Sequence, residues 1–394
     1  MKRLVYLLGI GLLFIVISAN GALADHNSGD TSPWKRVVEA TWQGFKAHYI
    51  YCGANCGDNA GLVFDPDIEY QATSEGIGYG LLMAVMMDDQ STFDMIYNAA
   101  YTYLFDASTG LFHWRADNSG LITGDGSATD ADQDIAAALI FAQRRVERGE
   151  WAQHATRPYG VSATALLDAI WSQIVVDGRY LKPGNQFGGN GRDIINLSYF
   201  APAWYRIYDQ FQATDRWQGV IEQGYESLFL TQGSPLGLAP DWSNADGSAA
   251  FAYCDSIARS REDCLYQMGF DAIRVPWRIG LDCLWFDEPR ACDWSRRSAE
   301  FLKSLPDGEF ARLYDLEGNV MVDYQNEAMV GMWLVVALAA GDQPLQARLE
   351  RQLSRFAANA VRNQHWGDSP QHYYNQSLAW FAAALLSGNF TNLS

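Results

Sequence analysis

Basic residues are scarce in this sequence, and the short motifs that mark many enzyme classes are missing. The chain has 28 Lys and Arg against 46 Asp and Glu, which gives a formal net charge of −18. Such a charge repels phosphate groups, which excludes nucleic acid and an anionic membrane surface as partners. No H-E-x-x-H, G-x-S-x-G or G-x-x-x-x-G-K-[ST] motif is present. Zinc-protease, α/β-hydrolase and P-loop chemistry are therefore not indicated.

Long apolar runs are confined to the N-terminus. Lys2 and Arg3 precede an almost wholly apolar segment at 4–17, and residues 22–24 match a small-residue cleavage site. Because the apolar segment is short for a membrane span, the pattern favours a signal peptide over a membrane anchor. We expect residues 1–24 to be a signal peptide. The mature chain is then secreted, to the periplasm or the extracellular space, and has no membrane partner.

Cysteine is rare as well, and its pattern does not indicate a metal site. None of the six His stands beside a Cys pair, so we expect no metal and no cofactor. Disulfides suit an exported protein, although sequence cannot choose among the possible pairings. We expect local pairing, because the two members of each close pair lie within one loop. These pairs are Cys52 with Cys56, Cys254 with Cys264, and Cys283 with Cys292.

Helical periodicity dominates the rest of the chain, and no linker or fixed repeat divides it. We therefore expect one domain over 25–394, all-α and monomeric, with short strands near 111–123 and 312–323. We expect twelve antiparallel helices to form a closed ring of hairpins, six inner and six outer, with a groove on one face. A superhelical stack of helix pairs is the alternative. The expected helices are 33–49, 75–88, 91–105, 132–148, 162–174, 199–211, 215–230, 272–284, 293–303, 325–340, 344–360 and 375–387.

The stretch SEGIGYG at 74–80 places the carboxylate of Glu75 at the start of an apolar helix. Thr73 or Ser74 is suited to cap this helix, so an ordinary helix start is one interpretation. The three glycines of the stretch disfavour a helix interior, however. We interpret them as clearance that lets a bulky ligand reach Glu75.

Two further stretches place acidic residues beside small or aromatic ones. Asp130 begins an alternating acidic run before an apolar helix, which also fits a helix cap; the spacing does not match a calcium loop. Asp271 and Arg274 share a helical face, which also fits a surface ion pair. Separate carboxylates suit glycoside hydrolysis, in which one acid protonates the leaving oxygen and another acts as base or nucleophile. The 14 Trp residues offer stacking platforms for sugar rings.

Four stretches together resemble glycoside hydrolase family eight, over nearly the whole mature chain. They are SEGIGYG at 74–80, ATDADQDIA at 128–136, NLSYFAP at 196–202 and FDAIRVPWR at 270–278. The resemblance implies an (α/α)6 barrel with a substrate groove, and an endo-acting enzyme that inverts the anomeric centre.

The resemblance also implies roles for individual residues. Glu75 stands at the position of the general acid, Asp271 at that of the general base, and Asp130 at that of the residue which holds the sugar at the cleavage point. A general acid needs a raised pKa, so we expect that of Glu75 to exceed the pKa of a free Glu. Expected substrate contacts are Tyr199 and Arg274, which would orient the base or its water, and the stacking candidates Trp114, Tyr373 and Tyr374.

One residue departs from the family pattern, and the substrate has several alternatives. Phe270 stands where relatives usually have Tyr beside the base. The Asp271 motif disfavours a chitosanase, and the stretch at 128–136 resembles endoglucanases more than xylanases. We therefore expect hydrolysis of β-1,4-linked glucan, as in a cellulase. The alternatives are a xylanase or chitosanase of the same family, and a non-catalytic glycan-binding protein.

Overall fold

The computed structural model describes residues 32–51, 61–69, 71–256 and 266–394. The predicted signal peptide at 1–24 lies outside these residues, and so do Cys52, Cys56 and Cys264. Residues 32–394 make up one compact unit. Among the described residues, no helix has both the length and the apolar character needed to span a membrane.

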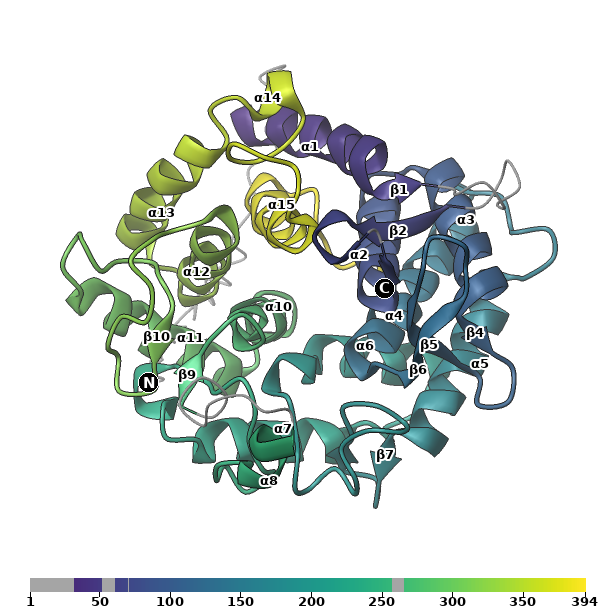
Figure 1. The fold of residues 1–394 in the computed structure, drawn as a ribbon, viewed down its shortest axis with the longest axis horizontal. Helices are drawn as coiled ribbons and strands as arrows, with labels where there is room; N and C mark the ends of the chain where they lie inside the picture. The colour runs from purple at the N-terminus through teal and green to yellow at the C-terminus, as the bar shows by residue number, and fades with distance from the viewer. Residues whose placement is uncertain (1–31, 52–60, 70, 257–265) are drawn as a thin grey trace, which may run out of the picture. The chain divides into compact units, whose positions relative to one another are not determined.

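Two concentric sets of helices make up this unit (Figure 1). Consecutive inner helices contact one another, and the last contacts the first, so the inner set closes on itself. It comprises α2 (Ser74–Met86), α4 (Thr129–Glu147), α6 (Pro202–Gln212), α10 (Val275–Phe286), α12 (Glu327–Ala340) and α15 (Tyr373–Ser387). The outer set comprises α1 (Pro33–Tyr49), α3 (Gln90–Ala99), α5 (Tyr159–Gln173), α7 (Gln218–Leu230), α11 (Pro289–Ser304) and α13 (Gln343–Phe356).

Each outer helix packs against at least one inner helix, and α11 packs against both α10 and α12, which confirms the predicted (α/α)6 barrel. All twelve predicted helices are present, with ends that shift by a few residues. Two short helices in the described part of the chain were not predicted, α8 (Phe251–Ser256) and α14 (Ala360–Asn363). Both are too short to produce a periodic pattern in the sequence.

An antiparallel sheet covers the start of α2 and α4, in the order β1-β2-β3-β5-β4 with β6 on β5. Only its β5 and β6 were predicted, since the other strands are too short to alternate visibly. The sheet consists of β1 (Ile50–Tyr51), β2 (Leu62–Asp65), β3 (Gln71–Thr73), β4 (Phe105–Asp106), β5 (Leu111–Ala116) and β6 (Ile122–Ser127). Separate two-stranded ladders pair β7 (Val175–Val176) with β8 (Tyr180–Leu181), and β9 (Gln267–Met268) with β10 (Tyr314–Asp315).

The glycines of α2 serve close packing, and the clearance that we expected from the sequence is wrong. A Cβ on Gly78 would lie 2.9 Å from the Cβ of Asp134 on α4. A Cβ on Gly80 would lie 2.9 Å from the Ile96 side chain of α3. Because real Cβ atoms do not approach other atoms so closely, the glycines let α2 pack tightly against its neighbours rather than open a path to Glu75.

One of the three expected disulfides lies wholly in the described part of the chain. Cys283 near the end of α10 is joined to Cys292 in α11, and their Cα atoms are 5.0 Å apart. This bond ties an inner helix to the outer helix that follows it. The other two expected pairs each include a residue outside the described part.

Candidate active site

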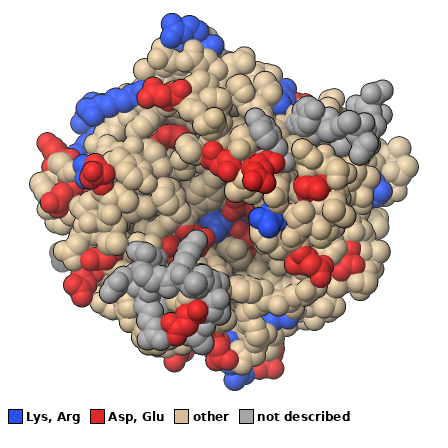
Figure 2. Space-filling view, in the orientation of Figure 1, with Lys and Arg blue, Asp and Glu red and all other residues tan. Residues whose placement is uncertain are grey.

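The sheet brings the first two carboxylates together. β3 leads directly into α2, and β6 leads into α4 through Ala128. Both strands pair with β5, so the helix starts that carry Glu75 and Asp130 lie side by side. Asp271 follows β9 and precedes the short 3-10 helix η5 (Ala272–Arg274), which leads into α10. A hollow in the face shown in Figure 2 has both acidic and basic side chains at its bottom.

Arg274 connects Glu75 and Asp130. Its Nη1 lies 2.7 Å from Glu75 Oε2 and 2.6 Å from Asp130 Oδ2. The Asp130 and Arg274 side chains are each only 3% exposed, so this pair is largely shielded from water. We had expected Arg274 to orient the base or its water. Its guanidinium contacts Glu75 and Asp130, while its Nε lies 3.3 Å from the Asp271 carbonyl oxygen.

A hydrogen-bond chain holds the other oxygen of Glu75. The Tyr373 hydroxyl donates to Glu75 Oε1 and also lies 3.2 Å from Thr73 Oγ1. Thr73 caps α2 and accepts from the Gly76 N–H at 3.1 Å. The Thr73 proton is therefore free to point at Tyr373, which leaves the Tyr373 proton for Glu75. Both carboxyl oxygens of Glu75 thus have fixed donors.

The pKa of Glu75 is raised to about 7, as expected for a general acid. Burial is the largest cause of this shift, because protein atoms crowd the carboxylate and keep water away from it. This holds even though 22% of the whole side chain is exposed. The charge of Arg274 acts in the opposite direction, and those of Asp130 and Asp271 raise the pKa further. The Tyr373 hydrogen bond lowers it. At neutral pH, a substantial fraction of Glu75 therefore carries the proton that acid catalysis needs.

Asp130 has one carboxyl oxygen with a vacant acceptor position. Its Oδ2 binds Arg274, whereas its Oδ1 is buried and has no hydrogen-bond partner among the described residues. A buried acceptor without a partner costs free energy, on the order of 1–3 kcal/mol. A sugar hydroxyl at this position would remove that cost, which fits the role predicted for Asp130.

Asp271 is held by a neighbouring aromatic residue that the sequence did not single out. The Trp242 indole Nε1 donates to Asp271 Oδ2 at 2.9 Å. Trp242 is buried and packs against Tyr253 and Tyr199. Asp241 accepts from the Gly269 and Ala272 N–H groups and so fixes the backbone on either side of Asp271. Neither role has a signal in the sequence, because the segments are joined only in the folded chain.

The predicted aromatic contacts fall into different environments. Trp114 is 37% exposed and its ring is covered on one side by Arg115 at 4.4 Å. Tyr199 and Tyr374 are half-buried and lie beside the Arg274 guanidinium, with Tyr374 donating to the Phe270 carbonyl at 2.6 Å. Tyr373 is only 4% exposed, so its ring offers little face for stacking; its hydroxyl on Glu75 is the contact that matters.

In the described part of the chain, no group of three or more His, Cys, Asp or Glu side chains is arranged to hold a metal ion. The arrangement offers Glu75 as a carboxylic acid and Asp271 as a second carboxylate. The shielded cation of Arg274 lies between Glu75 and Asp130. That set suits acid–base cleavage of a glycosidic bond.

Comparison with known proteins matches residues 10–387 to the model of Glycosyl hydrolases family 8. Endoglucanase A of Acetivibrio thermocellus is 30% identical over 94% of this chain and 72% of its own. Endoglucanase 2 of Ruminiclostridium josui is 30% identical over 95% and 75%, respectively. Among solved structures, Rex8A from Paenibacillus barcinonensis complexed with xylose has a TM-score of 0.75 and 25% identity, over 92% of this chain and 94% of that one.

Proposed function

The chain belongs to glycosyl hydrolases family 8, and we propose that it is an endo-acting hydrolase of β-1,4-linked glucan that inverts the anomeric centre. The raised pKa of Glu75 beside Asp130 and Arg274 is the observation that carries the proposal. The endoglucanases among its relatives support the substrate.

In this mechanism Glu75 donates its proton to the leaving glycosidic oxygen. Asp130, whose Oδ1 has no hydrogen-bond partner in the described part of the chain, accepts a hydrogen bond from a hydroxyl of the sugar that is being cleaved. Asp271 removes a proton from the attacking water, and the Trp242 N–H holds its carboxylate in place. Because a water must fit between acid and base, inversion predicts about 6.5–9.5 Å between the Glu75 and Asp271 carboxyl groups.

The experiment compares the wild type with Glu75→Gln on carboxymethylcellulose, mixed-linkage glucan, xylan and chitosan, followed by reducing-sugar release. We expect the wild type to act fastest on the two glucans and the variant to lose most activity on both. NMR of the first product would show the inverted anomer. A product with the retained anomer would contradict the inverting mechanism, and full activity in Glu75→Gln would contradict the role of Glu75 as the acid.

Xylan is the second candidate substrate, because two proteins similar to this chain are exo-oligoxylanases that release xylose from a reducing end. Faster hydrolysis of xylan than of glucan would favour it. We further propose that residues 1–24 direct export and are removed, which N-terminal sequencing of the exported protein would test.

A further inference from the structure

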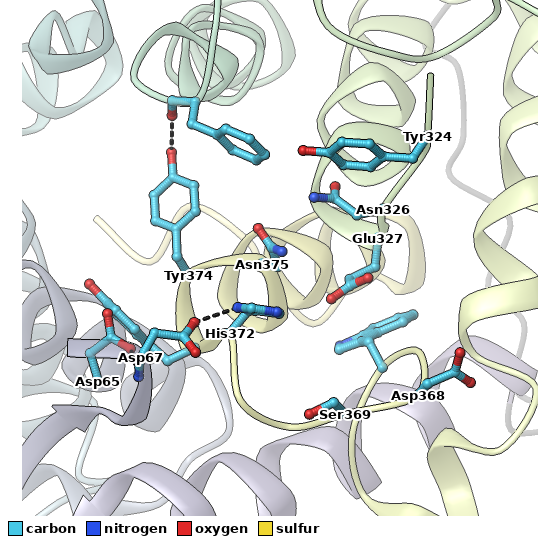
Figure 3. A pocket seen from close by; sticks show the side chains of 13 residues that line it. Asp65, Asp67, Tyr324, Asn326, Glu327, Asp368, Ser369, His372, Tyr374 and Asn375 are labelled. Carbon is cyan, nitrogen blue, oxygen red and sulfur yellow. Dashed lines mark hydrogen bonds and ion pairs between the residues drawn. The ribbon is translucent and has the colours of Figure 1, made fainter. Parts of the chain in front are cut away.

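A pocket of about 620 Å³ adjoins the candidate active site and is not used by the mechanism above. It lies between the starts of α12 and α15, where Asn326 caps α12 and His372 precedes α15 (Figure 3). Tyr373 lines the pocket and also binds Glu75, so pocket and acid are neighbours. A cavity of this size accommodates a sugar unit of a glycan chain.

Acidic groups dominate the lining. It includes four carboxylates, and none of the described residues that line it is a Lys or Arg. Figure 3 shows Glu327 on one side of the pocket and Asp65 and Asp67 on the opposite side, with His372 bonded to Asp67. The fourth carboxylate, Asp368, is exposed at the edge.

Glu327 is a buried carboxyl group that forms no ion pair with a Lys or Arg among the described residues. It is 7% exposed, and the Gln376 Nε2 group donates to its Oε1 at 3.3 Å. Burial raises its pKa. Asp134 in the core, by contrast, carries two hydrogen bonds from one Arg. A buried carboxyl group that faces a pocket without such a partner is suited to accept hydrogen bonds from a ligand.

Exposed aromatic rings complete the lining. Tyr324 is 48% exposed and Phe270 is 40% exposed, and both border the pocket. The amides of Asn326 and Asn375 also face it (Figure 3). Aromatic faces beside carboxylate and amide groups match the two sides of a sugar ring, which has apolar C–H faces and a rim of hydroxyl donors.

We propose that this pocket is a subsite for an uncharged sugar unit of the glycan chain, and that its carboxylates exclude units which carry acidic groups. Glu327 accepts a sugar hydroxyl as a charge-assisted hydrogen bond. A carboxylated unit would meet several like charges in a partly shielded space and be repelled. The proposal rests on the proposed function, since it makes the pocket part of the same groove.

Chain-length kinetics test the subsite. The probes are cello-oligosaccharides of increasing length, with Glu327→Gln as the variant and Glu39→Gln on the outer face of α1 as the matched control. Loss of a hydrogen bond to a charged group should lower kcat/KM about tenfold for chains long enough to reach the pocket. The shortest cleaved chain and the control should be unaffected. An equal effect on all lengths, or none, would overturn the subsite.

A charge reversal tests the exclusion of acidic units. Asp368→Lys should raise the rate on carboxymethylcellulose relative to neutral mixed-linkage glucan several-fold at low salt, and added salt should reduce that gain. Glu39→Lys, with the same charge change elsewhere, should leave the ratio unchanged. An unchanged ratio in Asp368→Lys would contradict exclusion. Inactivity of the wild type on every glucan would instead contradict the proposed function, so the two failures are distinguishable.

Discussion

Two Asp–Arg pairs join the start of α4 to the start of α10, and they differ in how fully they are satisfied. Asp130 pairs with Arg274, and Asp134 pairs with Arg278, one helical turn further along both segments. Both pairs are almost fully buried. The sequence spacing is the same on each side, so the two pairs are repeats of one arrangement at different depths.

The deeper pair is complete. Arg278 donates to both oxygens of Asp134, at 2.5 and 2.8 Å, and its Nε lies 3.2 Å from the Ser198 carbonyl. The Trp204 indole adds a further donor to Asp134 at 2.8 Å. Such a network holds two helices together and leaves little capacity for a ligand.

The pair at the groove is incomplete. Arg274 divides one Nη between Asp130 and Glu75, and Asp130 keeps a buried oxygen without a partner. The difference indicates that the same kind of residue pair stabilises the fold at one depth and leaves hydrogen-bonding capacity for substrate at the other.

Removal of the deeper cation should have the largest effect. Arg278→Met leaves the buried Asp134 charge uncompensated, which should lower the free energy of unfolding by about 3–5 kcal/mol. Urea unfolding at neutral pH measures the loss, and Arg278→Lys, which keeps a charge without the fork, should lose less. The comparison between the two pairs would break if Arg278→Met were as stable as the wild type.

Removal of the Arg274 cation at the groove should lower activity more than removal of the Arg278 cation does. Arg274→Met frees Glu75 from its Nη1 contact and removes the charge that lowers the Glu75 pKa, so the acid loses its position and donates less readily. We expect kcat to fall at least about a hundredfold on mixed-linkage glucan. Arg278→Met assayed below its unfolding range is the matched control and should retain most of its kcat. Equal losses of kcat would contradict the distinction.

The two aspartates should differ in their pH dependence. The Asp130 charge raises the pKa of Glu75, so in Asp130→Asn that pKa should fall. A general acid is active below its pKa, so the basic limb of the kcat/KM profile should move to lower pH. Asp134→Asn has no such contact with Glu75 and should leave the limb in place while lowering stability. A limb that rises in Asp130→Asn would contradict the electrostatic account.

The same pKa predicts how stability changes with pH. Glu75 has a folded pKa of about 7, above its usual value. Its contribution is therefore fully favourable below the unfolded pKa and is lost as pH rises through about 7. Glu75→Gln should thus gain thermal stability relative to the wild type at pH values above this range, and not under acid conditions. Thermal unfolding of both proteins, once at a pH above this range and once under acid conditions, measures the gain.

The sequence was sufficient to predict the ring of helices, because outer helices such as α13 carry one apolar face and inner helices such as α12 are apolar on nearly all sides. It also indicated Glu75, Asp130 and Asp271 as candidates, since motif order links them to a family. Long-range hydrogen bonds gave no such signal: Trp242 reaches Asp271 across a loop, and Tyr373 lies 298 residues from Glu75. The glycines of α2 misled for the same reason, because their neighbours on α3 and α4 are set by tertiary packing.

The smallest expected effect concerns the hydroxyl of Tyr373. Its hydrogen bond lowers the pKa of Glu75, so Tyr373→Phe should raise that pKa. The basic limb of kcat/KM should then move up by about 0.5–1 pH unit, the equivalent of one ordinary hydrogen bond. Tyr374→Phe removes a neighbouring hydroxyl that donates to the Phe270 carbonyl instead and should leave the limb in place. Asp130→Asn and Tyr373→Phe should thus move the basic limb of kcat/KM in opposite directions, which a general loss of structure would not do. A downward shift in Tyr373→Phe would show that the Tyr373 hydroxyl does not stabilise the Glu75 carboxylate.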